Sequence, residues 1–500
     1  MTNQINMRGL DNPMGHFVLV PFMAQGHMIP MIDLAHLLAD RGLLVTFITT
    51  PLNASRIRPT INRAQDKGLL IHFVELPFPC KEVGLPEGCE NVDIVPSGDL
   101  VLNFFEGMTL LGKPLELYLR KQDPYPSCII SDSCHHWTQE VAHNLQIPRI
   151  SFYSIRSFTL LCLHNIFQYK VYDRITNEHE PFIVPGLPQK IVVTKAQAPG
   201  FFTAPGYEEI DEKVKEAELA ADGIVMNTFE FLEPVYIENY TKAMGKKVWA
   251  VGPFFLHGNK DSADMTARGN KASIDINRCL NWLDSMKPRS VVYVSFGSLT
   301  IMSTSQLMEI GLGLEASNHP FIWVIKDCEY SPEVEEWLSQ GFKERTGSRG
   351  LIIKGWAPQM MILSHPAVGG FMTHCGWNST LEGLCAGVPM ITWPSFADQF
   401  LNERLIVDVA RIGLSVGVKE PGAWTMDVLN QHIFANKVQV ERAVRNVMDE
   451  GEEAEERRNR VKELGEKARE AMEEGGSSYA NMTGLIQQFS LKHNKNVEGI

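Results

Sequence analysis

Short apolar runs and amphipathic segments alternate along the first part of the chain. Residues 16–21 are almost entirely apolar, which is typical of a buried strand. Residues 30–41 carry apolar side chains at helical spacing and end before Gly42, and residues 43–48 form the next apolar run. This order predicts a strand, a loop, a helix and a second strand, which is how a doubly wound parallel sheet begins.

The same alternation continues and later restarts. After the first unit we expect strands at 128–131, 149–152 and 223–227, with a helix at 138–145. Residues 251–275 are rich in Gly, Lys, Asp, Asn and Ser without a sustained period, which predicts a linker. Beyond it the pattern predicts a second series of elements, with helices at 279–285 and 305–316 and strands at 290–296, 320–325, 351–354 and 388–393.

Two domains are expected, because 500 residues exceed the roughly 100–200 residues of an ordinary domain. We predict an α/β protein of two Rossmann-like, doubly wound domains that face each other across a cleft. We expect the C-terminal segment to pack back on the first domain. The predicted division is an N-terminal extension 1–15, a first domain 16–250, the linker 251–275, a second domain 276–474 and a C-terminal helix and tail 475–500.

Composition restricts the partners of the protein. The formal net charge of −13 argues against nucleic acid or an anionic membrane surface, because polyanions repel an acidic protein. The nine cysteines form no C-x-x-C pair, so we interpret them as free thiols of a reducing compartment. The first fifteen residues lack the apolar core of a secretory signal, and no run reaches the roughly 20 apolar residues of a membrane helix. We expect a cytoplasmic protein, a monomer without membrane insertion, that binds a small ligand.

Two polar residues follow strands in the first half, where ligands of parallel α/β sheets bind. His27 lies after the first strand and just ahead of the first predicted helix. A neutral imidazole at this place can take a proton from a hydroxyl group, although an exposed or capping histidine fits the pattern as well. Asp132 ends a later strand and can either fix the tautomer of His27 or cap the following helix. Asp123, which precedes a proline, is a weaker rival for that role.

The second half offers groups that can hold a phosphate. Ser298 follows a glycine turn at the end of a predicted strand, and residues 376–380 open a helix whose unpaired N–H groups suit an anion. His374 adds a donor just before that helix. Trp356 offers a flat face on which a nucleobase can stack, although an isolated tryptophan is more often part of a core. The alternative for the helix start is a capping box of Glu382 with Asn378 or Ser379.

Metal chemistry is not expected for this chain. It has no D-x-D motif, the acidic pair with which many sugar-nucleotide enzymes hold a divalent cation. The neighbours Cys134, His135 and His136 cannot converge on one ion from the start of a helix. Protein groups would therefore have to neutralise a bound diphosphate.

The stretch 356–399 contains W-A-P-Q, H-C-G-W-N-S, L-E-G and F-A-D-Q in that order. It resembles the plant secondary product glycosyltransferase signature of the plant family-one UDP-dependent glycosyltransferases over its full length. The resemblance extends from about His16 to the C-terminal helix and implies a GT-B type fold. The N-terminal P-F-M-A-Q-G-H-M resembles the branch that includes terpenoid, steroid, cytokinin and flavonoid glucosyltransferases. The chain departs from the family pattern in its extra N-terminal residues and at Ser395, where a larger apolar residue is common.

The resemblance also implies roles for individual residues. His27 would be the general base and Asp132 its partner. Trp356 would stack on the uracil, and Gln359 would hold the ribose with Glu382. Ser298, His374, Asn378 and Ser379 would hold the diphosphate. Ala357 and Trp377 would also belong to the donor site. The hydroxyls of the sugar would contact Asp398 and Gln399, and a glutamine in this last position usually accompanies glucosyl donors in the family.

The implied activity is that of an inverting UDP-sugar-dependent O-glycosyltransferase that needs no cofactor besides its co-substrate. It would transfer glucose from UDP-glucose to a hydroxyl of a small apolar plant metabolite, such as a triterpenoid, steroid, flavonoid or cytokinin. A nicotinamide oxidoreductase is disfavoured because no G-x-G-x-x-G follows the first strand, and a serine hydrolase because no G-x-S-x-G occurs. A catalytically silent sugar-nucleotide-binding protein is the remaining alternative. Expected walls of an acceptor pocket are Phe22, Trp137, Phe152, Tyr153 and Phe201, although residues of this kind more often belong to a core than to a pocket.

Overall fold

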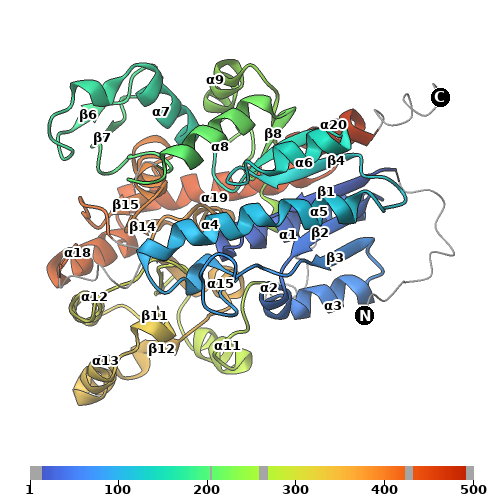
Figure 1. The fold of residues 1–500 in the computed structure, drawn as a ribbon. Helices are drawn as coiled ribbons and strands as arrows, with labels where there is room; N and C mark the ends of the chain where they lie inside the picture. The colour runs from blue at the N-terminus through green and yellow to red at the C-terminus, as the bar shows by residue number, and fades with distance from the viewer. Residues whose placement is uncertain (1–13, 203–204, 258–267, 423–431, 491–500) are drawn as a thin grey trace, which may run out of the picture.

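The computed structural model describes residues 14–202, 205–257, 268–422 and 432–490 (Figure 1). Most of the predicted N-terminal extension, part of the predicted linker and the last ten residues lie outside these ranges. The described residues form two α/β halves, each built on a parallel sheet, as the alternating pattern predicted. No helix of the described part of the chain is long and apolar enough to cross a membrane.

The first sheet has seven parallel strands in the order β3-β2-β1-β4-β5-β8-β9. The next strands in the chain, β2 and β3, lie on one side of β1, and β4 lies on its other side. The switch point of the sheet is therefore between β1 and β4. The loops that follow β1 and β4 therefore meet at one place. The strands are β1 His16–Val20, β2 Leu44–Thr49, β3 Ile71–Glu75, β4 Cys128–Asp132, β5 Arg149–Tyr153, β8 Gly223–Met226 and β9 Val248–Ala250.

Helices cover this sheet, and a small antiparallel pair, β6 Phe182–Ile183 with β7 Val192–Val193, lies apart from it. The central strands are buried at every position, which explains why they lack an apolar–polar alternation. The helices are α1 Gln25–Asp40, α2 Pro51–Arg56, α3 Arg58–Asp66, α4 Val101–Leu110, α5 Gly112–Leu119, α6 Thr138–Leu145, α7 Ser157–Gln168, α8 Glu208–Ala220 and α9 Pro234–Met244.

The first helix begins earlier than predicted. We expected it to start at Pro30, but α1 starts at Gln25 and contains the proline, so His27 lies in its first turn. A proline inside a helix leaves the carbonyl four residues earlier without its N–H partner. That carbonyl belongs to Gly26, and the side-chain amide of Asn378 in the second half donates to it at 2.7 Å. The broken helical hydrogen bond is thus replaced by one between the two domains.

The second sheet has six parallel strands in the order β12-β11-β10-β13-β14-β15. Its switch point lies between β10 and β13, where Ser295 is paired with Thr373. The loops after these strands carry Ser298 and His374, so the topology brings both residues to one edge. The strands are β10 Val291–Ser295, β11 Phe321–Ile325, β12 Gly350–Lys354, β13 Val368–Thr373, β14 Met390–Thr392 and β15 Gly413–Ser415.

The C-terminal helix α20 (Ser477–Ser490) packs against the first half, and Figure 1 shows it beside that domain. The hydroxyl of Ser478 donates to the carbonyl of Gly252 at 2.6 Å, and the Phe489 ring lies 5.6 Å from the ring of Trp249. The other helices of the second half are α11 Ile276–Asp284, α12 Thr304–Ser317, α13 Pro332–Trp337, α14 Lys343–Thr346, α15 Gln359–Leu363, α16 Trp377–Cys385, α17 Gln399–Arg404, α18 Lys437–Met448 and α19 Glu452–Met472.

Candidate active site in the interdomain cleft

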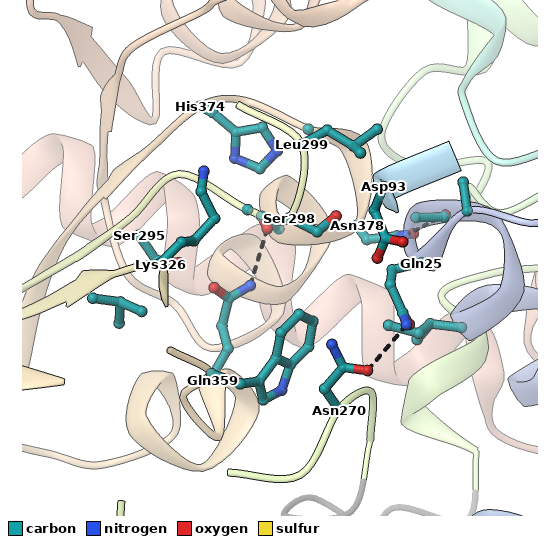
Figure 2. A pocket seen from close by; sticks show the side chains of 18 of the residues that line it. Gln25, Asp93, Asn270, Ser295, Ser298, Leu299, Lys326, Gln359, His374 and Asn378 are labelled. Atoms are coloured by element: carbon teal, nitrogen blue, oxygen red, sulfur yellow. Dashed lines mark hydrogen bonds between the residues drawn. The ribbon is translucent and has the colours of Figure 1, made fainter. Parts of the chain in front are cut away.

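A cleft of about 650 Å³ lies between the two halves and is lined by both of them (Figure 2). Figure 2 shows His374, Ser298 and Lys326 toward one end of it, and Gln359 and Asn270 toward the other. The cleft lies beyond the carboxyl ends of the central strands, where parallel sheets bind ligands. It is lined by His27 and by every predicted donor-binding residue, namely Ser298, Trp356, Ala357, Gln359, His374, Trp377, Asn378, Ser379, Glu382, Asp398 and Gln399.

His27 and Asp132 form a hydrogen-bonded pair at the first switch point. Nδ1 of the imidazole lies 2.7 Å from Oδ2 of Asp132, and the hydroxyl of Ser154 is 3.3 Å from the same nitrogen. The carboxylate is completely buried, and its other oxygen accepts the backbone N–H of Cys134 at 3.1 Å. The His27 side chain is 29% exposed, on the side of the cleft. A carboxylate on Nδ1 favours the tautomer in which Nε2 is unprotonated and can accept a proton.

The two groups shift each other's pKa in opposite directions. Burial lowers the pKa of His27, but the charge of Asp132 and the hydrogen bond to it outweigh burial and raise that pKa above its ordinary value. Burial raises the pKa of Asp132, yet the neighbouring imidazole brings the net shift below the ordinary value. The aspartate therefore stays ionised near neutral pH. The histidine is a stronger base than a free imidazole.

His374 lines the cleft in the second domain, next to the backbone of Gly297 and Gly376. A Cβ on Gly297 would lie 2.4 Å from Cε1 of His374, and Gly297 has a φ of +70°, so only glycine fits there. Burial, and then the charge of Lys326, lower the pKa of His374 to about 3. The imidazole is therefore neutral at physiological pH. It can donate one hydrogen bond to an anion without carrying a charge of its own.

A network of side chains holds Glu382 in the cleft wall. The amide of Gln359 donates to Oε2 of Glu382 at 2.7 Å and to the hydroxyl of Ser379 at 3.0 Å. The guanidinium of Arg268 binds the other oxygen of Glu382. The carboxylate is almost fully buried and still accepts from two fixed donors. Trp356 lies next to this network on the cleft wall.

The F-A-D-Q motif closes the cleft with a strained turn. Ala397 has a φ of +53°, which is uncommon for a residue with a Cβ. The side-chain oxygen of Gln399 points back to the same loop, where it accepts hydrogen bonds from the backbone N–H groups of Ser395 at 2.8 Å and Phe396 at 3.1 Å. Burial raises the pKa of Asp398, and the amide of Asn402, which donates to it at 2.8 Å, opposes that shift.

Two of the predicted donor-binding residues also join the domains. The indole N–H of Trp377 donates to the carbonyl of Asn227 at 2.8 Å, and the indole is nearly buried. The buried guanidinium of Arg156 lies 4.5 Å from the same ring and donates to the carbonyl of Leu401 at 3.0 Å. Asn378 contacts Gly26, as described above. Direct contacts therefore join the two halves beside the cleft.

The predicted acceptor walls do not line this cleft. Phe152 is completely buried and stacks at 6.2 Å from Phe254, because its strand is covered on both faces. Trp137 and Tyr153 are also core residues, and Phe201 packs against the core from outside. The Phe22 ring lies 5.3 Å from that of His27, and Phe152 is paired with Asp132 across β4 and β5 through the backbone. Large aromatic residues next to strand ends serve the core here, which their sequence position does not reveal.

Several cleft residues were missed by the sequence reasoning. Lys326 follows β11, and its ammonium lies 3.1 Å from Glu329, with its amine directed toward His374 in Figure 2. The rule that pointed to Ser298, a polar residue after a strand, could have found it. Arg268, Asn270 and Gln25 also line the cleft. No group of three or more His, Cys, Asp or Glu side chains suited to a metal ion occurs among the described residues.

The chain matches known proteins over almost its whole length. Residues 16–256 match the family model described as "Glycosyltransferase, N-terminal domain", and residues 259–431 match "UDP-glucoronosyl and UDP-glucosyl transferase". UDP-glycosyltransferase 73C6 of Arabidopsis thaliana is 48% identical over 477 residues, which cover 95% of this chain and 96% of the relative. UDP-glycosyltransferase 73C25 of Barbarea vulgaris is also 48% identical over 477 residues, with the same coverage.

Solved structures agree with this match. UGT73P12 of Glycyrrhiza uralensis, complexed with glycyrrhetinic acid 3-O-monoglucuronide, is 35% identical with a TM-score of 0.88 and 97% coverage of both chains. UGT89C1 of Arabidopsis thaliana, complexed with UDP-L-rhamnose, is 30% identical with a TM-score of 0.73, covering 95% of this chain and 99% of the other. The chain belongs to the plant family-one UDP-glycosyltransferases, enzymes of the GT-B fold that transfer a sugar from a UDP-sugar.

Proposed function

We propose that this UDP-glycosyltransferase moves glucose from UDP-glucose to a hydroxyl of a small apolar acceptor, with inversion at the sugar. The pair of His27 and Asp132 carries this proposal, because a histidine bonded to a buried carboxylate lines the same cleft as the residues of the donor signature. In this assignment Trp356, Gln359 and Glu382 hold the uridine, and Asp398 and Gln399 hold the sugar. The acceptor enters from the side of the first domain.

In the proposed reaction the acceptor hydroxyl gives its proton to Nε2 of His27. The hydroxyl oxygen forms a bond to C1 of the sugar on the face opposite the nucleotide. The bond between C1 and the β-phosphate oxygen breaks, and its electron pair leaves with UDP. Asp132 stabilises the imidazolium that forms. An α-linked donor gives a β-glucoside in this reaction.

Protein groups stabilise the leaving diphosphate in this proposal. The neutral imidazole of His374 and the hydroxyl of Ser298 donate hydrogen bonds, and the N-terminus of α16 presents unpaired N–H groups. The ammonium of Lys326 adds a positive charge near the same place. Donors that are already fixed in the cleft need no reorganisation when charge develops on the leaving oxygen.

Gln399 is proposed to select the donor sugar. Because its side-chain oxygen already accepts two backbone N–H groups of its own loop, we assign the contact with the sugar to its NH2 group, which would donate to a hydroxyl. We expect Gln399→His to lower the preference for UDP-glucose over UDP-galactose and UDP-glucuronate about three- to tenfold, the effect of one uncharged hydrogen bond. Values of kcat/KM for the three donors measure this. Gln340→His, on an exposed glutamine, is the control, and an unchanged preference in Gln399→His rules out the sugar contact.

The acceptor class is tested with a panel of compounds. Relatives of this chain were solved with glycyrrhetinic acid 3-O-monoglucuronide, quercetin and pterostilbene, which supports a small hydroxylated acceptor. We expect at least one of a set of triterpenoids, steroids, flavonols and cytokinins to gain one hexose from UDP-glucose, as read by mass spectrometry. Tight binding of UDP-glucose without transfer to any compound would instead favour a silent sugar-nucleotide-binding protein.

A further inference from the structure

Arg268 joins the two sides of the cleft through one guanidinium. On the donor side it binds Glu382 of helix α16. On the other side its Nε and Nη2 both donate to Oδ2 of Asp33, at 3.1 and 2.9 Å. Asp33 belongs to helix α1, which also carries His27. A single side chain therefore contacts both the carboxylate assigned to the ribose and the helix that holds the base.

These three groups are shielded from water. The side chains of Arg268, Asp33 and Glu382 are only 10%, 15% and 4% exposed. The guanidinium also lies over the ring of Phe255, at 5.2 Å from its centroid. The cost of burying a carboxylate as deeply as that of Glu382 is offset by a cation or by several hydrogen-bond donors. Loss of the guanidinium would leave two buried carboxylates without their shared cation.

The segment around Arg268 is fixed to the donor site. Ser273 and Trp356 exchange hydrogen bonds, since the N–H of Trp356 donates to the Ser273 hydroxyl at 2.9 Å and the N–H of Ser273 donates to the Trp356 carbonyl at 2.8 Å. Gly269 has a φ of +86°, and a Cβ on it would lie 2.4 Å from Cζ2 of Trp356. The backbone therefore passes directly against the indole, which leaves Arg268 with little freedom.

The same segment contacts α1 on both sides of His27. Asn270 accepts a hydrogen bond at 3.1 Å from the amide of Gln25, two residues before His27, as Figure 2 shows. Arg268 holds Asp33, six residues after it. The first turn of α1 has no side-chain cap and contains a proline-interrupted hydrogen bond, so outside contacts have to fix its position.

We propose that Arg268 is a positioning residue that couples donor binding at Glu382 to the placement of the base helix through Asp33. This rests on the proposed function, in which Glu382 holds the ribose and His27 takes the proton. Arg268 holds the Glu382 carboxylate in the orientation that the ribose hydroxyls need. Through its second arm it keeps α1, and with it His27, at a constant distance from the donor.

The two arms of Arg268 can be separated by mutation. Asp33→Asn removes the charge on α1 and leaves the contact between Arg268 and Glu382, so we expect an unchanged Kd for UDP and a kcat about tenfold lower. Arg268→Ala removes both contacts, and we expect a Kd for UDP at least tenfold higher as well as a lower kcat. Arg268→Lys supplies a positive charge but not the planar guanidinium that reaches both carboxylates. Compared with Arg268→Ala, it should therefore restore UDP binding more than kcat.

Asp40→Asn is the matched control, because Asp40 also lies on α1 and pairs with His257 at the far end of the helix. It should retain the wild-type Kd and kcat. Isothermal titration with UDP, initial rates and thermal unfolding of each variant separate binding, turnover and folding. A wild-type kcat in Asp33→Asn, or a wild-type Kd for UDP in Arg268→Ala, would overturn the proposal. If wild-type protein transfers no glucose, the proposed function fails, while the UDP measurements still test Arg268.

Discussion

Replacement of His27 by alanine is expected to lower turnover about 10²–10⁴-fold and to leave UDP binding at the wild-type level. The imidazole lies on the wall of the cleft that belongs to the first domain, whereas the proposed nucleotide contacts all come from the second domain or the segment before it. Its loss removes the acceptor of the proton and little else. Initial rates with saturating UDP-glucose and titration with UDP measure the two effects separately.

The chain contains a matched control for this experiment. His257 and Asp40 form a second histidine–aspartate pair with the same 2.7 Å contact, and neither residue lines the cleft. His257→Ala should therefore keep wild-type turnover. Turnover of His27→Ala within a few fold of the wild type would remove His27 from the mechanism.

Asp132→Asn is expected to reduce turnover to a similar extent and to change its pH dependence. Asparagine can turn its NH2 group toward Nδ1 of His27, which favours the tautomer with a hydrogen on Nε2, where no proton can be accepted. The same substitution in a serine-protease triad lowers kcat about 10⁴-fold. We expect a loss of about 10²–10⁴-fold here, and Asp40→Asn again provides the control.

The pH effect has a defined sign. In the wild type the carboxylate raises the pKa of His27, so the neutral base is lost as pH falls through a value above the ordinary 6.5. Without the charge of Asp132, burial dominates and lowers that pKa. The acid limb of the kcat profile should therefore move to lower pH in Asp132→Asn, even though its plateau is lower. If the acid limb of Asp132→Asn stayed at the wild-type pH, a group other than His27 would control the loss of kcat at low pH.

The sequence suggested that His27 and Asp132 lie near each other, because both residues come at the ends of predicted strands. Buried parallel strands can be recognised as apolar runs, and ligands bind beyond their carboxyl ends. The same rule pointed to Ser298 and His374, which the second switch point brings together. What the sequence could not show was the pairing of β1 with β4, since strand order depends on contacts distant in the chain.

The predicted start of α1 was wrong, and the predicted acceptor walls do not line the cleft, both for physical reasons. Proline is a sound signal for the first turn of a helix, but here a side chain 352 residues away compensates for the hydrogen bond that Pro30 breaks. The aromatic residues near strand ends, such as Phe152, fill the core instead of the cleft. Arg268 lies in a segment with no periodic pattern, so its contacts with Asp33 and Glu382 had no signal in the sequence.

The configuration of the product tests the central claim most directly. Wild-type protein is incubated with UDP-glucose and a hydroxylated acceptor from the panel, and the anomeric proton of the purified glucoside is examined by NMR. In-line attack assisted by His27 predicts a β-glucoside and one UDP released for each glucoside formed. An α-glucoside, or release of UDP without any glucoside, would contradict the account.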